Sequence, residues 1–200
     1  MRNHVIKTAL ISFAAAVIAV VLFCAGCLVV APSFASDAVY GMGMYGFSAS
    51  LAEDAYNRKG DEESLCVLVE RAITAEDHAL LEKYGAAYLA SEYFANKAKA
   101  PQNALYSGNY RGYVAGNVAC AQYAGGKLNT ALETAFASVD GYAEYNSVQY
   151  LMRAVISSGD KTAASSLRER LAEVSAEGES AQRVFADLDI LDTFIGMAEN

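Results

Sequence analysis

The residue types that carry out acid–base or metal chemistry are few in this sequence and widely separated. Histidine occurs twice, at His4 near the N-terminus and at His78 beside two acidic residues. A catalytic zinc site needs at least three protein ligands at suitable spacing, and neither histidine forms such a set with Cys66 or Cys120. We therefore expect no metal site and no cofactor. Whether the two cysteines form a disulfide in an oxidising compartment stays open.

Two acidic clusters, Asp61-Glu62-Glu63 and Glu76-Asp77, have the composition of a general acid–base pair. Each lies where a helix is predicted to begin, a position at which Asp accepts backbone hydrogen bonds and Glu interacts favourably with the helix dipole. The sequence has no Gly-x-Ser-x-Gly motif, no phosphate-binding loop and no dinucleotide fingerprint. We expect these acids to cap helices, and we expect no enzymatic activity.

One stretch departs from the acidic character of the chain. Between Tyr93 and Asn129 there is no Asp or Glu, and cationic residues are mixed with aromatic ones. Cations and rings on a helical surface can bind an acidic peptide, a carboxylate or a cell-wall glycan. The alternative is that the tyrosines pack in the core and the cations are solvated. The candidate partner-binding residues in this stretch are Lys97, Lys99, Tyr106, Tyr110, Arg111 and Tyr113.

The charge balance restricts the class of partner. The chain has 23 acidic and 15 basic residues, and only two bases, Arg2 and Lys7, precede residue 33. The remaining 13 bases and 23 acids give residues 33–200 a net charge of −10. Such a charge disfavours nucleic acid and anionic membrane surfaces as partners. We expect no nucleic-acid partner, and we expect a protein partner whose identity the sequence leaves open.

The longest apolar segment lies at residues 8–30. Its 23 residues carry no charge, and as a helix they would reach about 34 Å, enough for a hydrocarbon core of about 30 Å. Arg2 and Lys7 place the N-terminus in the cytoplasm by the positive-inside rule. We therefore expect a single-pass anchor in the cell membrane over residues 1–32 and an extracellular domain over residues 33–200.

Two other fates of the apolar segment stay open. Cleavage before Ser36 would use the small residues of Ser33-Phe34-Ala35, which follow the helix-breaking Pro32. Lipidation would modify Cys27, because Cys24-Ala25-Gly26-Cys27 resembles a bacterial lipobox. A retained anchor is favoured because the apolar run is longer than the core of a signal peptide.

Helix-forming patterns occupy the rest of the chain and must position the candidate residues. Only two prolines and no tryptophan occur, Ala and Leu are abundant, and no alternating strand pattern is present, so we predict an all-α fold. The last helix places Val184 and Leu191 on one apolar face and Asp187 elsewhere. Residues 101–112 are predicted to form a loop. Residues 33–43 are predicted to form a short helix or a tight link next to the membrane. The helix that ends near residue 90 begins at Thr74 or Asp77. The other predicted helices cover residues 44–58, 62–74, 91–100, 113–124, 127–138, 142–157, 161–175 and 180–198.

The predicted turns recur at a regular spacing. Gly60, Gly126 and Gly159 are 66 and 33 residues apart, and Gly43 precedes Gly60 by 17. A period of 33 is typical of helix-pair repeats. The fifth, ninth and twelfth residues after each glycine are mostly small or apolar, so we expect them to face the core. They are Ser48, Ala52, Ala55, Leu65, Val69, Ala72, Ala131, Ala135, Ser138, Ala164, Arg168 and Leu171.

Glycines also recur every four residues in Gly108-x3-Gly112-x3-Gly116. In a membrane this spacing would indicate helix dimerisation, but Arg111 and Asn117 make the stretch too polar to span a bilayer. We expect it to allow close packing of a helix pair outside the membrane.

The stretch Leu81-x-x-Tyr84-Gly85-x-x-Tyr88 resembles the Trp-x2-Leu-Gly-x2-Tyr signature of the tetratricopeptide repeat family. The resemblance extends over about residues 35–176, with a break at residues 93–112. Lys-Gly-Asp-Glu-Glu-Ser-Leu at residues 59–65, with the Val-Glu-Arg-Ala that follows, is similar to uncharacterised membrane-anchored helical-repeat proteins of Gram-positive bacteria. The resemblance implies antiparallel helix pairs stacked as an α-solenoid, whose concave surface binds partner segments. It also implies that Asn117 lies on an inner helix, where the family often uses Asn against a bound peptide backbone.

These observations predict a membrane-anchored helical-repeat protein that acts outside the cytoplasmic membrane. Its expected role is protein–protein interaction or scaffolding, and its N-terminal helix would also contact the lipid bilayer. The alternative is a binding module for cell-wall glycan or another small ligand.

Overall fold

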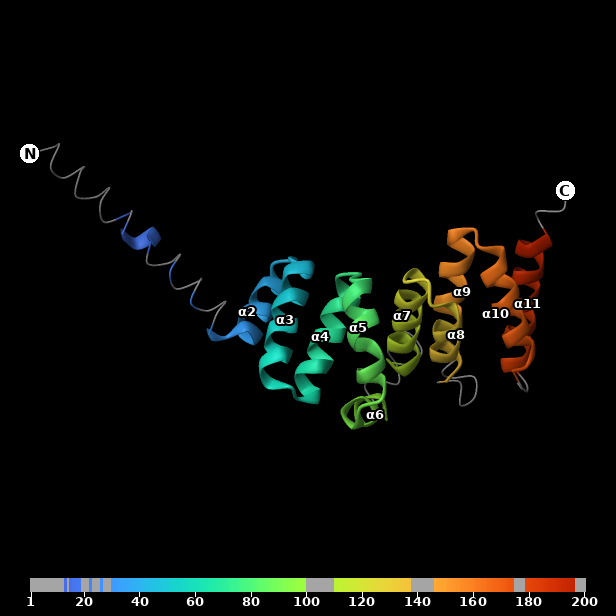
Figure 1. The fold of residues 1–200 in the computed structure, drawn as a ribbon, viewed down its shortest axis with the longest axis horizontal. Helices are drawn as coiled ribbons and strands as arrows, with labels where there is room; N and C mark the ends of the chain where they lie inside the picture. Colours follow the sequence, from blue (N-terminus) through green and yellow to red (C-terminus); the bar gives the residue numbers. More distant parts are fainter. Residues whose placement is uncertain are drawn as a thin grey trace, which may run out of the picture. The chain divides into compact units, whose positions relative to one another are not determined.

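The computed structural model describes most of the chain beyond residue 29. The described residues are 30–99, 110–137, 146–174 and 179–196, together with Phe13, residues 15–18, Leu22 and Gly26. Within these ranges the regular structure is helical and no strand occurs, so the all-α class is confirmed. The helices are α2 (Pro32–Gly41), α3 (Tyr45–Lys59), α4 (Glu62–Thr74), α5 (His78–Leu89), α6 (Glu92–Lys99), α7 (Tyr110–Ala124), α8 (Leu128–Ala137), α9 (Asn146–Ser158), α10 (Lys161–Ala172) and α11 (Glu179–Gly196) (Figure 1).

The predicted helix boundaries agree closely with the observed ones in most of the described chain. Helix α4 begins and ends at the predicted residues. The main difference is that α7 begins at Tyr110 rather than at Tyr113, because the buried Tyr110 side chain holds the first turn of the helix in the core. Residues 101–109 of the predicted loop lie outside the described residues.

The chain divides into two compact units, residues 1–71 and 72–200. The predicted boundary at residue 32 stays a prediction, because most of the segment before it lies outside the described residues. No helix in the described part of the chain is long and apolar enough to cross a bilayer. The predicted anchor at residues 8–30 falls mainly on residues that are not described and also stays a prediction.

In the first unit, α2 and α3 pack against each other around two serines. Ser36 Oγ donates a hydrogen bond of 2.9 Å to the carbonyl of Ser48, and Ser48 Oγ donates one of 2.9 Å to the carbonyl of Ser36. Both residues are fully buried. Because each hydroxyl is bonded to the opposite backbone, the two helices pack closely without leaving a buried polar group unpaired.

In the second unit, alternate helices of the sequence are neighbours in space. Helix α7 packs against α5 and α9 as well as against α8, and α10 packs against α9 and α11 (Figure 1). The residues of the stretch that resembles the tetratricopeptide signature, Leu81, Tyr84, Gly85 and Tyr88, are all buried on α5. The helix row α5, α7, α9 is therefore the element that positions the candidate residues of α7.

Two glycines set the spacing within this row. A Cβ atom on Gly85 would lie 2.5 Å from Val118 Cγ2, and one on Gly116 would lie 2.7 Å from Tyr150 Cβ. Both distances are far below an ordinary contact, so α7 approaches α5 and α9 more closely than a side chain at either glycine would allow. The close helix packing predicted at Gly116 is confirmed.

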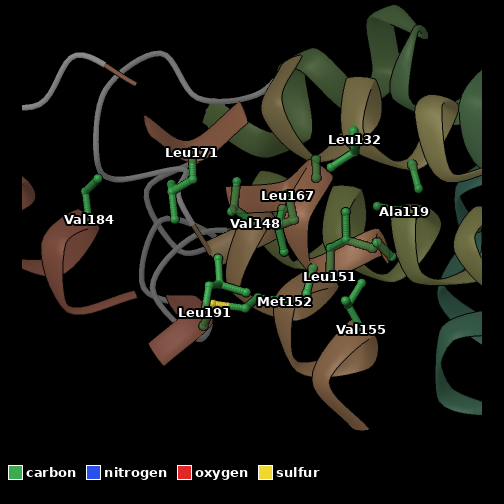
Figure 2. Close-up of a cluster of buried hydrophobic side chains, with 14 residues drawn as sticks. Ala119, Leu132, Val148, Leu151, Met152, Val155, Leu167, Leu171, Val184 and Leu191 are labelled. Carbon is green, nitrogen blue, oxygen red and sulfur yellow. The ribbon is translucent and has the colours of Figure 1, made fainter. Parts of the chain in front are cut away.

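The second unit has an apolar core between α7 and α11. Leu151, Leu167 and Leu191 come from α9, α10 and α11 and have no exposed surface. Figure 2 shows them converging with neighbouring aliphatic side chains. The residues at the predicted repeat positions are buried as expected, and these are Ser48, Ala52, Ala55, Leu65, Val69, Ala72, Ala131, Ala135, Ala164 and Leu171.

The other two repeat positions differ. Ser138 lies outside the described residues, and Arg168 is half-exposed. Its Nε donates to Asp192 Oδ1 at 2.8 Å, and a second nitrogen donates to Asp192 Oδ2 at 3.2 Å, which joins α10 to α11. Hydrogen bonding from Arg168 lowers the pKa of Asp192. An arginine fits this position because its aliphatic stem covers apolar surface while its guanidinium reaches a carboxylate.

The prediction for Asp187 was wrong. We expected this residue away from the apolar face of the last helix, and the structure buries it. Its carboxylate accepts a hydrogen bond of 3.3 Å from Gln149 Nε2 on α9. The partner is distant in sequence, so a helical pattern within residues 180–198 alone does not reveal it.

The turn after α4 has the same geometry as the glycine turns. Gly43, Gly126 and Gly159 have φ values of 79°, 76° and 76°, and Glu76 has a φ of 53°. The Glu76 N–H donates to the carbonyl of Ile73 at 3.1 Å, and the Asp77 N–H donates to the carbonyl of Ala72 at 2.9 Å. Gly126 and the residue after it make the same pair of hydrogen bonds. Glu76 lies 16 residues after Gly60, close to the spacing of 17 between Gly43 and Gly60. The regular series of turns therefore continues at a position where the sequence has no glycine.

Replacing Glu76 with glycine should stabilise the protein by about 0.5–1 kcal/mol. The left-handed conformation destabilises the folded state by about 1–2 kcal/mol when the residue carries a Cβ. Glycine removes this strain, but the greater conformational freedom of its unfolded chain offsets about 0.5–1 kcal/mol of the gain. Urea unfolding followed by circular dichroism measures the difference. Glu133→Gly, on the exposed side of α8, is the matched control and should destabilise by about 1 kcal/mol. Equal destabilisation by both changes would contradict a strained turn at Glu76.

Candidate partner-binding surface

Part of the predicted site lies in an aromatic cluster at the start of α7. Tyr110 is 5% exposed, and its hydroxyl lies 2.8 Å from the hydroxyl of Tyr88 on α5. The ring of Phe94, from α6, lies 6.0 Å from the ring of Tyr110 and 5.1 Å from that of Tyr88, centroid to centroid. Tyr110 is therefore a core residue that joins α5, α6 and α7, and it offers a partner little surface.

Two of the predicted cations lie over rings of this cluster. Lys97 Nζ is 5.3 Å from the centroid of Tyr110, and Arg111 Cζ is 5.1 Å from the centroid of Phe94. Such cation–π contacts contribute about 0.5–1 kcal/mol at exposed sites. Lys99 is exposed at the end of α6, and Tyr106 lies outside the described residues. This end of α7 therefore combines aromatic packing with cations that already interact with rings.

Tyr113 lies one turn beyond Tyr110 on α7, where this helix meets α9, and Asn117 lies one turn further along. The ring of Tyr113 contacts the ring of Tyr150 edge-to-face, with centroids 6.0 Å apart and planes at 72°. Asn117 Nδ2 donates a hydrogen bond of 2.8 Å to the carbonyl of Tyr113, which fixes the orientation of its amide. Both residues are half-buried. The predicted set is thus divided between two places on α7.

A polar hollow on α9 lies beside Tyr113. It has a volume of about 270 Å³ and is lined by Asn146, Gln149, Tyr150 and Arg153. These residues follow the helical spacing of three and four, so they form one face of α9. The hollow lies outside the residues singled out from the sequence. The signal that would have found it is this row of polar side chains within the helix predicted at residues 142–157.

A second hollow lies between the α7–α8 and α9–α10 turns. It has a volume of about 360 Å³, and its polar groups bond to one another. The hydroxyl of Tyr123 lies 2.6 Å from Ser158 Oγ and donates to Asp160 Oδ2 at 3.3 Å, and Asp160 Oδ1 accepts from the N–H of Ala163. Asp160 is the N-cap of α10. These hydrogen bonds connect the two turns, so the polar groups of this hollow stabilise the fold and offer a ligand few unsatisfied partners.

A third hollow is mostly apolar. It has a volume of about 290 Å³, and Arg111 is its charged lining residue. Small side chains of α5, α7 and α8 make up most of its wall, and a wall of this kind gives a ligand few hydrogen-bonding groups for orientation. The polar hollow on α9 is therefore the better candidate for specific recognition.

Cys120 lies one turn beyond Asn117 on α7 and is half-buried. Both Cys66 and Cys120 are free thiols in the structure. Burial raises the pKa of Cys120 to about 11. Because the folded-state pKa is raised, the protonated thiol contributes stability below its ordinary pKa of 9.0 that is lost as the pH rises towards about 11.

Cys120 should therefore react slowly with iodoacetamide at pH 8. The thiolate is the reactive form, and the raised pKa lowers its fraction at pH 8 by roughly 100-fold. In a variant with the other three cysteines changed to alanine, the alkylation rate should rise about tenfold per pH unit between pH 8 and pH 10. The same variant unfolded in urea is the control. Equal rates for the folded and unfolded chains at pH 8 would contradict the burial of this thiol.

The arrangement on α7 and α9 is suited to binding by hydrogen bonds, ring contacts and one guanidinium. Across the residues that the structure describes, no group of three His, Cys, Asp or Glu side chains could hold a metal ion. Comparison of the chain with protein-family models, with curated proteins and with solved structures finds no match in any of the three.

Proposed function

We propose that this chain is a membrane-anchored helical-repeat protein that binds an acidic peptide segment of a partner protein. The binding surface, here called the α7–α9 face, consists of Tyr113, Asn117, Asn146, Gln149, Tyr150 and Arg153. The observation that carries the proposal is the polar hollow on α9, which adjoins the contact between Tyr113 and Tyr150.

The chemistry of the α7–α9 face suits an extended peptide. Side-chain amides such as that of Asn146 provide both donors and acceptors, as a peptide backbone does. Arg153 is exposed, and a guanidinium binds a carboxylate through two parallel hydrogen bonds. Tyr113 and Tyr150 supply large, rigid surfaces of the kind enriched in binding hot spots. The guanidinium of Arg153 therefore favours an acidic segment at this face.

The repeat architecture supports the same proposal. The side-by-side packing of α5, α7 and α9 and the recurring turns fit tetratricopeptide-like helix pairs stacked as a solenoid. Solenoids of this kind use an inner row of helices to bind partner segments. The resemblance to tetratricopeptide repeats implies that Asn117 lies on such an inner helix. We include this arrangement in the proposal.

The anchor defines where binding would take place. The uncharged run at residues 8–30 has the length and composition of a membrane span, and Arg2 and Lys7 precede it. We therefore propose a single-pass protein of the cell membrane, with its N-terminus in the cytoplasm and residues 33–200 outside. A scaffold in this position would hold its partner near the membrane surface.

Photo-crosslinking in cells tests the α7–α9 face. A benzoylphenylalanine at Tyr150 should give one discrete adduct with a partner protein, and the same probe at Glu169, exposed on α10, should give none. Arg153→Glu should weaken capture at least about tenfold, equivalent to about 1.4 kcal/mol, because it replaces the cation with a repelling charge.

Equal adducts at Tyr150 and Glu169, or capture unchanged by Arg153→Glu, would overturn the proposal. Retention of the purified protein on cell wall stripped of protein, with no adduct at Tyr150, would favour glycan binding instead.

A further inference from the structure

The hairpin formed by α2 and α3 buries small and apolar residues together with two serines, and it exposes several large apolar residues. Its interface contains the reciprocal hydrogen bonds of Ser36 and Ser48, both fully buried. Its surface exposes large apolar residues, including Met42 at 72% and Phe34 at 66%. Large exposed apolar patches on a soluble surface mark interaction sites. The exposed residues, here called the α2–α3 patch, are Phe34, Met42, Met44, Tyr45 and Phe47.

Four of the five patch residues, all except Phe34, lie in a stretch without charge. Residues 38–52 contain no Asp, Glu, Lys or Arg. The nearest preceding acid, Asp37, forms an ion pair of 2.8 Å with Arg71. The guanidinium of Arg71 lies 3.5 Å from the centroid of the Tyr40 ring. The charge of Asp37 beside the patch is therefore paired with that of Arg71, whose guanidinium also contacts the ring of Tyr40.

The position of the patch in the chain identifies what covers it. The uncharged run at residues 8–30 ends immediately before α2, and Val30 is helical and 80% exposed. At Ala31 the backbone leaves the helical region, with φ −133° and ψ 65°, and α2 then begins at Pro32. This break allows α2 to take a direction different from that of the preceding run. Helix α2 can then lie along the surface of the membrane in which that run is anchored.

The two helices carry their apolar residues where this orientation requires them. Phe34 lies in the first turn of α2, and Met42 is the residue directly after its last turn. Met44 directly precedes α3 and Phe47 lies in its first turn, whereas Arg58 and Lys59 lie in its last turn. A helix of this length extends about 22 Å, so α3 changes from apolar to charged along its axis.

We infer that the α2–α3 patch inserts into the interface of a lipid bilayer, so that the hairpin is a second membrane contact. This inference rests on the proposed anchoring of residues 8–30. The composition of the patch, with Phe, Tyr and Met and without charge, is that of interfacial segments. Because residues 33–200 are acidic overall, binding is driven by apolar burial and does not require anionic lipid.

Tryptophan fluorescence tests the inference, because the chain has no tryptophan of its own. Four single variants of the full chain are reconstituted in phosphatidylcholine vesicles with bromine on the acyl chains near the glycerol. Phe34→Trp and Phe47→Trp report on the patch, Asn57→Trp on the far end of α3, and Val17→Trp on the apolar run. Bromine should lower the fluorescence of both patch variants at least about twofold relative to Asn57→Trp, since interfacial residues are buried to about 5–10 Å.

The outcomes separate the two proposals. Quenching of Val17→Trp without quenching of the patch variants would overturn the inference and leave the anchor in place. Quenching of none of the four would overturn the anchor, and the inference with it. Unquenched patch variants that crosslink between chains would assign the patch to a second copy. Circular dichroism matched to the parent chain ensures that each exposed substitution preserves the fold.

Discussion

Replacing Leu191 with alanine should lower the free energy of unfolding of the second unit by about 2–5 kcal/mol. Leu191 is fully buried on α11 among the side chains of α9 and α10, and its truncation removes buried methyl groups and leaves a cavity. Urea unfolding followed by circular dichroism measures the loss. Leu191 joins α11 to this core, so its truncation should weaken the packing of the last helix in particular.

The adjacent residue provides the matched control for Leu191. Ile190 is 46% exposed on the same helix, so Ile190→Ala should cost less than about 1 kcal/mol, since much less apolar surface leaves a buried environment. Equal losses for the two variants would show that α11 is not packed as the structure has it.

Gly116→Ala should destabilise the second unit by about 1–3 kcal/mol, the usual cost of overpacking. The added Cβ would lie 2.7 Å from Tyr150 Cβ and 2.8 Å from Tyr150 Cδ2. A Cβ moves only with its backbone, so α7 and α9 must separate. Because Tyr150 also lines the polar hollow, the same change should weaken partner capture by the α7–α9 face.

Gly46→Ala is the control for this effect. A Cβ on Gly46, in the first turn of α3, would have no neighbouring heavy atom within 4 Å. Alanine is favoured over glycine in helices by up to about 1 kcal/mol, so this variant should be neutral or stabilised. Stabilisation by Gly116→Ala as well would contradict the close approach of α7 and α9.

The acid-free stretch at residues 93–129 and the geometry of α7 lead to different groupings of the site residues. The sequence grouped Lys97, Tyr110 and Arg111 with Tyr113 and Asn117 as one cation–aromatic surface. In the structure the first three belong to the aromatic cluster with Tyr88 and Phe94, and the last two adjoin α9. The sequence stretch was informative, but its residues are divided between the aromatic cluster at the start of α7 and the contact between α7 and α9.

The sequence by itself determined the helices and most of their ends. A glycine with positive φ needs no distant partner, because a missing Cβ removes a steric clash within the residue itself. An N-cap such as Asp77 or Asp160 likewise bonds an N–H three residues away. Such signals are short in range, so the amino-acid sequence is sufficient to locate the turns at Gly43, Gly60, Gly126 and Gly159.

Only the tertiary structure decided which of these residues face one another. Glu76 adopts the turn conformation of a glycine, Tyr110 enters the core through Tyr88, and Asp187 is buried beside Gln149. Burial depends on contacts between helices that are far apart in sequence. A helical period gives the face on which a residue lies, and only packing determines whether that face meets solvent or another helix.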